Sequence, residues 1–198
     1  MKILWFTNTA CSASDFLNNK EFTGGWLKSL EQELNKRNDI NLAICFYSKA
    51  NLEPFQYLST SYFPVKKKWT KNKFLRLLSR ISPKKKNVHE INSLLNIVEI
   101  FNPDIIHIHG TEENFGLIQN FVDIPVLISV QGILSSIENK FFSGIPNKII
   151  KKHESFLKKV LFSGIDNSYK NLKFKSSRER TILKDALFIT GRTNFDKR

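Results

Sequence analysis

The chain alternates between short apolar runs and longer stretches in which apolar residues recur every three or four positions. The apolar runs predict strands, because the strands of a parallel sheet are buried on both faces and carry few polar residues. The predicted strands cover residues 2–7, 40–47, 55–65, 104–109, 125–130 and 186–190. Polar residues interrupt the pattern in the strand at 55–65.

The stretches with helical spacing predict amphipathic helices that pack one face on a sheet. The first begins at Gly24, with Thr23 as its N-cap, and ends near Asn38. The second begins with the capping box Asn87-Val-His-Glu90 and ends at Asn102-Pro103. Three more cover residues 112–122, 146–162 and 168–185. Because strands and helices alternate, we expect an α/β fold with a doubly wound parallel sheet.

The composition predicts one domain. With 198 residues, of which 41% are hydrophobic and 12% aromatic, the chain can bury one substantial core, so we expect a single domain over residues 1–198. Cys11 and Cys45 are too few for a disulfide framework and lie in or beside predicted strands. No signal peptide is evident, and no apolar run approaches the ~18 residues of a membrane span. We therefore expect a cytoplasmic protein with reduced, structural thiols.

The formal net charge of +13 is unevenly distributed along the chain. Residues 64–87 hold ten Lys or Arg and no acidic residue, and apolar side chains interleave with these charges. Such a basic amphipathic segment suits an anionic membrane surface, and it also suits single-stranded nucleic acid. The spacing of the residues does not separate the two. The predicted membrane or anion contacts are Lys66, Lys67, Lys68, Trp69, Lys71, Lys73 and Arg76.

Two glycines, Gly24 and Gly25, stand at the start of the first predicted helix, after the first predicted strand. Glycine lets a ligand approach the backbone closely, and the unpaired N–H groups at a helix start favour a phosphate. The pair is neither the dinucleotide-binding fingerprint nor a P-loop. A phosphate site therefore stands beside the alternative of an ordinary turn.

Polar residues also follow three later strands. His107 and His109 stand two apart in one strand, so both side chains project from the same face. We expect His107 to be the deeper one and hydrogen-bonded in the core, and His109, beside Gly110, to face a ligand. Gln131 closes the next strand with a donor and an acceptor, and Arg192 follows the last strand, where it can bind an anionic group.

Metal and nucleophilic chemistry are not indicated. Two histidines could bind a metal, but no third ligand of clear spacing is present, and Glu112 and Glu113 are possible ligands without a distinctive spacing. The sequence contains no Gly-x-Ser-x-Gly nucleophile elbow and no signal for a Cys–His pair. We therefore predict no metal site and no cofactor.

The order of these pieces resembles glycosyltransferase family 4, and the similarity is to its N-terminal Rossmann-like domain. It extends over essentially the whole chain, and the order and spacing of the motifs are more specific than any one of them. The motifs are Lys-Ile-Leu-Trp-Phe at 2–6, Gly24-Gly25-Trp26, Pro103-Asp104-Ile-Ile-His107-Ile-His109, Pro125-Val-Leu-Ile-Ser-Val-Gln131-Gly132 and Ala186-Leu-Phe-Ile-Thr190-Gly-Arg192-Thr193.

The resemblance implies one half of a GT-B architecture, in which two Rossmann-like domains face each other. Such enzymes move a sugar from a nucleotide-sugar donor to a glycan or lipid-linked acceptor, with retention of configuration and without a metal. The resemblance places Gly24 and Gly25 near the donor phosphates, and it places His109, Gln131 and Arg192 on the acceptor or sugar side. It also implies peripheral docking on the inner face of a membrane, which would suit residues 64–87.

Two departures from the family pattern qualify this expectation. Many members carry a His where this chain has Gln131, so its contact with the donor sugar is expected to differ. The family's second, donor-binding domain, with its Glu-x-x-x-x-x-x-x-Glu motif, has no counterpart before Arg198. The resemblance thus implies an acceptor-side half with little activity alone, and the Lys- and Asn-rich composition associates it with surface polysaccharide synthesis.

Two other functions compete with this hypothesis. The first is a non-catalytic binding or membrane-docking subunit that pairs with a separate donor-binding chain. The second is a nucleic-acid-binding Rossmann domain, which only the charge supports and which we rank last.

Overall fold

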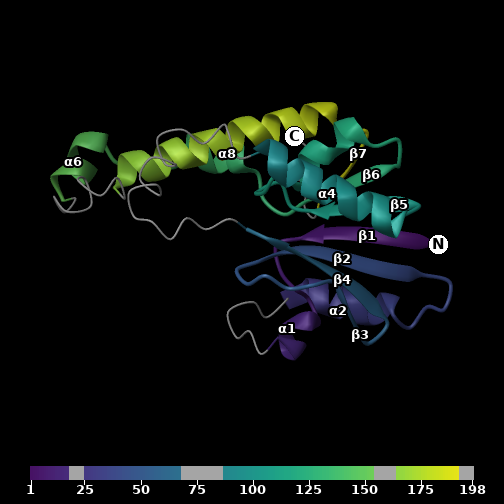
Figure 1. Cartoon of the computed structure of the whole chain (residues 1–198). Helices are drawn as coiled ribbons and strands as arrows, with labels where there is room; N and C mark the ends of the chain where they lie inside the picture. The colour runs from purple at the N-terminus through teal and green to yellow at the C-terminus, as the bar shows by residue number, and fades with distance from the viewer. Residues whose placement is uncertain (18–24, 68–86, 154–163, 192–198) are drawn as a thin grey trace.

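A seven-stranded sheet forms the centre of the protein, in a computed structural model that describes residues 1–17, 25–67, 87–153 and 164–191 (Figure 1). The order across the sheet is β3-β4-β2-β1-β5-β6-β7, and every pair is parallel except β3 with β4. Counted along the chain, the parallel strands lie in the order 3-2-1-4-5-6 of the Rossmann fold. The strands are β1 (Lys2–Thr7), β2 (Asn41–Ser48), β3 (Phe55–Tyr57), β4 (Thr60–Lys66), β5 (Ile105–His109), β6 (Val126–Val130) and β7 (Phe188–Gly191).

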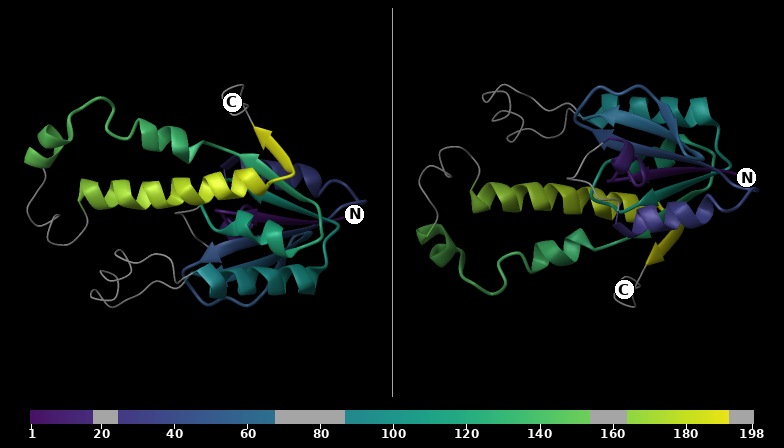
Figure 2. Two further views of the ribbon diagram at one scale, coloured as in Figure 1. Left: turned by 90° about the horizontal axis from the view of Figure 1, so that it is seen from above. Right: turned by 90° about the horizontal axis from the view of Figure 1, so that it is seen from below.

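Helices cover both faces of this sheet, so the predicted α/β class with a doubly wound sheet is confirmed. Helices α4 and α8 and the 3-10 helix η2 lie on one face, and α1 and α2 lie on the other (Figure 1). Seen from above and below, α8 extends past the sheet in the same direction as α5 and α6 (Figure 2). The helices are α1 (Ala13–Phe16), α2 (Gly25–Leu34), α4 (Asn87–Phe101), η2 (Phe115–Phe121), α5 (Leu134–Asn139), α6 (Asn147–Lys152) and α8 (Ile165–Asp185).

The core is divided in two by the sheet, because successive side chains of a strand point to opposite faces. In β1, Leu4 and Phe6 pack in the cluster that includes Leu94 of α4, whereas Trp5 packs in the cluster that includes Leu27 of α2. Each of the three β1 side chains is at most 1% exposed. Fully burying a side chain of this size stabilises a fold by about 1.5–3 kcal/mol. Strand β1 therefore holds both helical layers on the sheet.

The expected strand at 55–65 is instead a hairpin of two antiparallel strands. In β3 and β4, Tyr57 pairs with Thr60, so Leu58 and Ser59 form a two-residue turn. Leu58 has a φ of +53°, a conformation that such turns require and that leucine rarely adopts. Its side chain is 66% exposed. Without a Gly or Asn at the turn, the sequence did not indicate the reversal.

Several predicted helix boundaries are wrong. The helix expected at 112–122 is the 3-10 helix η2, which begins only at Phe115 because the residues before it take part in a polar network described below. Of the helix expected at 146–162, the described part is α6, in which Ile149 is 52% exposed rather than buried. Helix α2 ends at Leu34, short of 38, and α8 begins at Ile165. The short helices α1 and α5 were not predicted.

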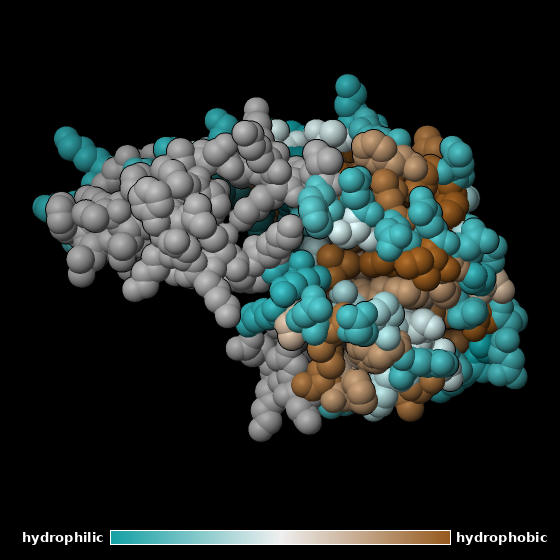
Figure 3. Space-filling model, viewed as in Figure 1, coloured by the Kyte–Doolittle hydropathy of each residue, from teal (hydrophilic) through white to brown (hydrophobic). Residues whose placement is uncertain are grey.

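On the described part of the face that Figure 3 shows, hydrophobic residues form groups that alternate with groups of hydrophilic residues. Among the residues that the structure describes, no helix is both long and apolar enough to span a bilayer. Most of the basic segment predicted at 64–87 lies outside the described residues, which stop at Lys67 and resume at Asn87.

Candidate functional site

A cavity of about 210 Å³ lies at the carboxyl ends of β5, β6 and β7, on the face of the sheet that α2 covers. Helix α2 supplies one wall and the three strands supply the other. Open α/β sheets bind ligands at this edge, near the point where the strand order reverses, which here is between β1 and β5. The lining residues are Trp26, Leu30, His107, His109, Ser129, Gln131, Thr190 and Gly191.

The two histidines of β5 line this cavity together, as the spacing of two predicted. Their ring centroids are 3.9 Å apart, and His107 Nε2 lies 2.6 Å from the Ser129 hydroxyl. Their predicted depths are reversed, because His109 is only 1% exposed and His107 is half-buried. The reason is aromatic packing, since the rings of Trp5 and Trp26 lie 4.7 and 5.7 Å from the His109 ring.

Burial keeps both imidazoles neutral. Desolvation lowers the pKa of His107 to about 4, and desolvation together with the neighbouring His107 lowers the pKa of His109 to about 2. Both ring nitrogens of His109 are buried, and neither has a hydrogen-bond partner within the described ranges. A neutral imidazole offers one donor and one acceptor. The cavity can therefore bind a polar neutral group, but its histidines are poor general bases.

The other predicted site residues fall into two groups. Gln131 lines the cavity with the histidines, and Gly25 begins α2 with a φ of +48°, a conformation that favours glycine. Gly24 and Arg192, proposed for the donor phosphates and the sugar side, lie outside the described residues. So do the predicted membrane-contact residues Lys68, Trp69, Lys71, Lys73 and Arg76.

The remaining predicted contact residues, Lys66 and Lys67, end β4 and differ from each other. Lys66 is exposed, whereas Lys67 forms an ion pair with Glu113 at 2.7 Å and lies 4.6 Å from the centroid of the Tyr47 ring. Lys67 therefore belongs to a network within the protein, on the opposite face of the sheet from the cavity.

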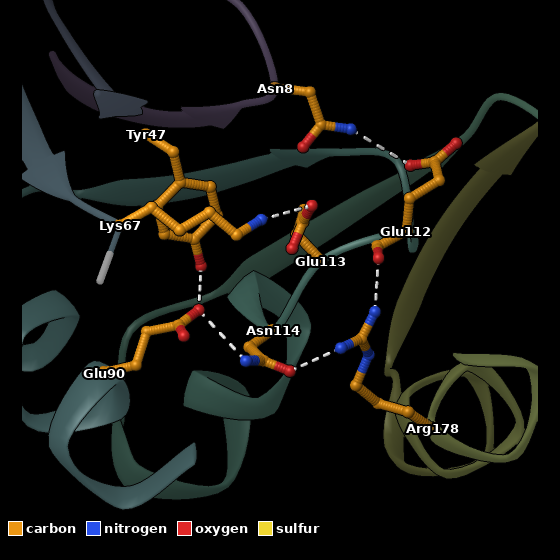
Figure 4. Close-up of polar contacts among 8 residues, drawn as sticks. All are labelled: Asn8, Tyr47, Lys67, Glu90, Glu112, Glu113, Asn114 and Arg178. Atoms are coloured by element: carbon orange, nitrogen blue, oxygen red, sulfur yellow. Dashed lines mark hydrogen bonds and ion pairs between the residues drawn. The ribbon is translucent and has the colours of Figure 1, made fainter. Parts of the chain in front are cut away.

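Sequence reasoning did not predict this network, which Figure 4 shows. Its central residue is Arg178 of α8, which donates to Asn114 Oδ1 at 2.6 Å and to the backbone carbonyl of Glu112. Asn114 in turn donates to the Glu90 carboxylate at 3.0 Å, and Glu90 also accepts from the Tyr47 hydroxyl. The network thus connects α8, the loop after β5, the first turn of α4 and the end of β2.

Charge balance holds this network together. Burial lowers the pKa of Arg178, and the nearby carboxylates, Glu113 foremost, oppose that effect. Burial and Glu90 raise the pKa of Tyr47, so its hydroxyl stays protonated and donates. A larger cavity of about 440 Å³ adjoins the network and is lined by residues of β2, β4 and α4, including Lys66 and Glu90.

A second buried carboxylate holds the loops that follow β5 and β6. Glu179 of α8 is fully buried and accepts a hydrogen bond from the Thr111 hydroxyl at 2.5 Å. It also accepts from the backbone N–H groups of Leu134 and Ser135, at 3.1 and 3.0 Å. Those N–H groups begin α5, where a helix has no internal partner for its donors. Glu179 therefore caps α5 from another helix.

Thiol chemistry has no support at either cysteine. Cys11 and Cys45 are free and buried, as predicted for structural thiols. Burial raises the pKa of the Cys11 thiol to about 12 and that of Cys45 well above its ordinary value. The thiolate is the reactive form, so neither side chain is prepared to act as a nucleophile.

The signals that point to the missed residues are weak in a single sequence. Glu112 and Glu113 are adjacent acids after a strand, and Arg178 and Glu179 lie in a helix with many other charged residues. Nothing in their spacing shows that they meet, because more than sixty residues separate Arg178 from Glu112.

The strand order and the cavity at the switch point define a Rossmann-like α/β protein. No protein-family model matches the sequence, and neither does any curated protein. Among solved structures, the chain is similar to UDP-GlcNAc 2-epimerase from Neisseria meningitidis bound to UDP-GlcNAc, with 18% identity and a TM-score of 0.35. The match covers 89% of this chain and 44% of that enzyme, so this chain spans less than half of its length. A likeness this remote says nothing about activity, and the fold assignment rests on the strand order.

Proposed function

We propose that this chain is the acceptor-side half of a retaining, metal-independent glycosyltransferase of the GT-B type. The observation that supports this most is the cavity at the carboxyl ends of β5, β6 and β7, which combines Trp26 with Gln131 and two neutral histidines. An apolar wall with a few converging polar groups is typical of small-molecule sites. A sugar ring has the matching chemistry, since it presents C–H faces and hydroxyl edges.

In this proposal the chain positions a sugar and leaves most of the charge stabilisation to a second domain. The backbone N–H group of Gly25, where α2 begins, binds the donor diphosphate, and the family resemblance assigns the same role to Gly24. His109 and Gln131 hold a sugar ring beside the reacting carbon. The transition state has oxocarbenium character, and cations of the donor-binding domain stabilise the leaving diphosphate.

The deciding experiment is a transfer assay with the product of the native reading frame. Labelled nucleotide sugars are offered with membrane extract of the native host as the source of acceptors, and the anomeric configuration of the product is determined by NMR. We expect transfer with retention, and Gln131→Ala should lower it about tenfold through a lost hydrogen bond to the sugar. Gln32→Ala, an exposed glutamine on α2, is the matched control. Absence of transfer with every donor would refute the proposal.

A further inference from the structure

The packing of His109 leaves one feature of the cavity unexplained. Its ring is 1% exposed, and both ring nitrogens lack a hydrogen-bond partner within the residues that the structure describes. Burying polar atoms without partners is unfavourable, so most buried polar groups in proteins are paired. His107 shows the ordinary arrangement, because its Nε2 lies 2.6 Å from the Ser129 hydroxyl. His109 sits beside the same cavity with its hydrogen-bonding capacity unused.

The described lining of the cavity also carries no charged group. Its polar members are two imidazoles, two hydroxyls and an amide, and the imidazoles are neutral at physiological pH because burial lowers the pKa of both. A phosphate or carboxylate that entered would lose part of its hydration without gaining a cation from the described lining. A ligand that carries only hydroxyl or amide groups loses less hydration free energy. Ser129, Gln131 and Thr190 can replace the hydrogen bonds that such a ligand makes to water.

The size and the walls of the cavity restrict the class of ligand further. The volume of about 210 Å³ falls below the ~300–1,000 Å³ of sites for drug-sized ligands, and well above the ~30 Å³ that one water occupies. The described part of the cavity therefore has room for a single ring. Trp26 and Leu30 add an apolar wall from α2, which suits the C–H face of such a ring.

We propose that this cavity binds one uncharged pyranose ring, and that His109 forms a hydrogen bond to one of its hydroxyl groups. This inference rests on the proposed function and adds a substrate class to it, namely neutral hexoses and N-acetylhexosamines rather than uronic acids or sugar phosphates. The transferred sugar of the donor and the terminal sugar of the acceptor share this chemistry.

Ligand-observed NMR on the protein tests the substrate class directly. The probes are methyl glycosides of neutral hexoses and of N-acetylglucosamine, each compared with the uronic acid of the same ring configuration. We expect saturable binding of a neutral glycoside and about tenfold weaker binding of its uronic acid. Equal or tighter binding of the uronic acid would overturn the proposal.

Substitutions locate the bound ring at His109. His109→Phe keeps an aromatic ring against the two tryptophans and removes both nitrogens, so neutral glycosides should bind about tenfold more weakly. His153→Phe, at an exposed histidine after α6, should leave binding unchanged. If His109→Phe fails to fold, as near-UV circular dichroism would show, Gln131→Leu replaces it with the same expected loss. Unchanged binding in the folded variant would refute the role of this site.

Competition separates the two sources of the ring and the two proposals. If a nucleotide sugar displaces the bound glycoside, the cavity takes the donor sugar; if only an acceptor glycan does so, it takes the acceptor. Transfer activity without glycoside binding at the cavity would refute this inference and leave the proposed function standing. Glycoside binding by a native product that transfers nothing would refute the proposed function and leave the neutral-ring site standing.

Discussion

The two faces of the sheet differ in charge at the same edge. On the α2 face, Trp26 and His109 line a cavity without a charged side chain in its described lining. On the α4 face, Lys67 and Arg178 meet three carboxylates, and hydrogen bonds connect four separate segments (Figure 4). Strand β5 contributes His107 and His109 to the cavity, and the loop that follows it contributes Glu112, Glu113 and Asn114 to the charged network.

This difference separates a charged region that fixes loops from an uncharged region that lines the cavity. An ion pair that is taken out of water is stable only when further hydrogen bonds satisfy it, and such a network fixes the segments it joins. The charged region thereby fixes the loop after β5, which begins directly after His109. In our proposal, the uncharged region then leaves the ring nitrogens of His109 for a bound sugar, and the fixed loop supports selectivity for it.

The largest expected effect breaks the charged region. Arg178→Met removes the cation that Asn114 and the Glu112 carbonyl bind, and it leaves Lys67 as the cation of the network beside three carboxylates. We expect the free energy of unfolding to fall by about 3 kcal/mol. Lys175→Met, an exposed position on the same helix, should change it by less than about 0.5 kcal/mol. Urea denaturation measures both, and similar values for the two variants would show that the network does not stabilise the fold.

The next effect lies at the boundary of the two regions, at Gly110. Its φ is +92°, and a Cβ there would overlap the carboxylate of Glu112, which accepts from Asn8. Gly110→Ala should therefore destabilise the protein by about 1–2 kcal/mol through backbone strain. Gly132, after β6, has open space around the position of a Cβ, so Gly132→Ala is the matched control with little effect. Thermal unfolding of the two variants measures this difference in stability, and equal melting temperatures would contradict the prediction.

The uncharged region predicts a dependence of stability on pH. The unfolded chain protonates its histidines near pH 6.5, whereas the folded pKa values of His107 and His109 are lowered to about 4 and about 2. Stability is thus fully present above pH 6.5 and is lost as the pH falls toward those values. Each histidine contributes a loss of about 1 kcal/mol between pH 6.5 and about pH 5.5.

A difference between variants isolates this contribution from that of other groups. His109→Asn cannot titrate, so its loss of stability over that interval should be about 1 kcal/mol smaller than that of the wild type. His153→Asn, at an exposed site, should follow the wild type. Guanidinium denaturation at the two pH values gives the comparison, and parallel pH profiles for all three proteins would show that His109 is not buried in its neutral form.

The smallest effect concerns the rim of the charged region. The side chains of Lys67 and Glu113 are 34% and 22% exposed, so solvent and salt screen their ion pair. Lys67→Ala should cost about 0.5 kcal/mol at low ionic strength and less at high salt. Lys66→Ala, at the exposed neighbour, should cost nothing measurable. A loss for Lys67→Ala that is independent of salt would place this pair among the buried ones.

Local pattern predicted most of the architecture and only part of the site. The buried strands, α4 and α8 were evident because apolar periodicity reflects which face packs on the core. The β3–β4 hairpin was not, because Leu58 occupies a turn conformation that glycine usually adopts. The shared face of His107 and His109 followed from strand geometry, but their depths depended on Trp5 and Trp26, which other segments contribute.

The charged network could not be predicted from the sequence pattern, for a different reason. Arg178 and Glu112 are far apart in the sequence, and each is flanked by polar residues of the kind found in exposed segments. Their meeting depends on how α8 packs beside η2, which is a property of the tertiary structure. Glycosyltransferase family 4 membership likewise stays a prediction, because it rests on the order of soft motifs.

The place of Glu179 in the chain has a consequence for folding during synthesis. Its partners Thr111, Leu134 and Ser135 precede it by 68, 45 and 44 residues, so a ribosome releases them well before the carboxylate. Contacts of such large sequence separation form late, because closing long loops costs chain entropy. A nascent chain that ends before α8 can pair β1, β2 and β5, yet the loops after β5 and β6 lack the Glu179 carboxylate until α8 has been synthesised. The carboxyl-terminal edge of β5 and β6 is thus completed only after α8 has left the ribosome.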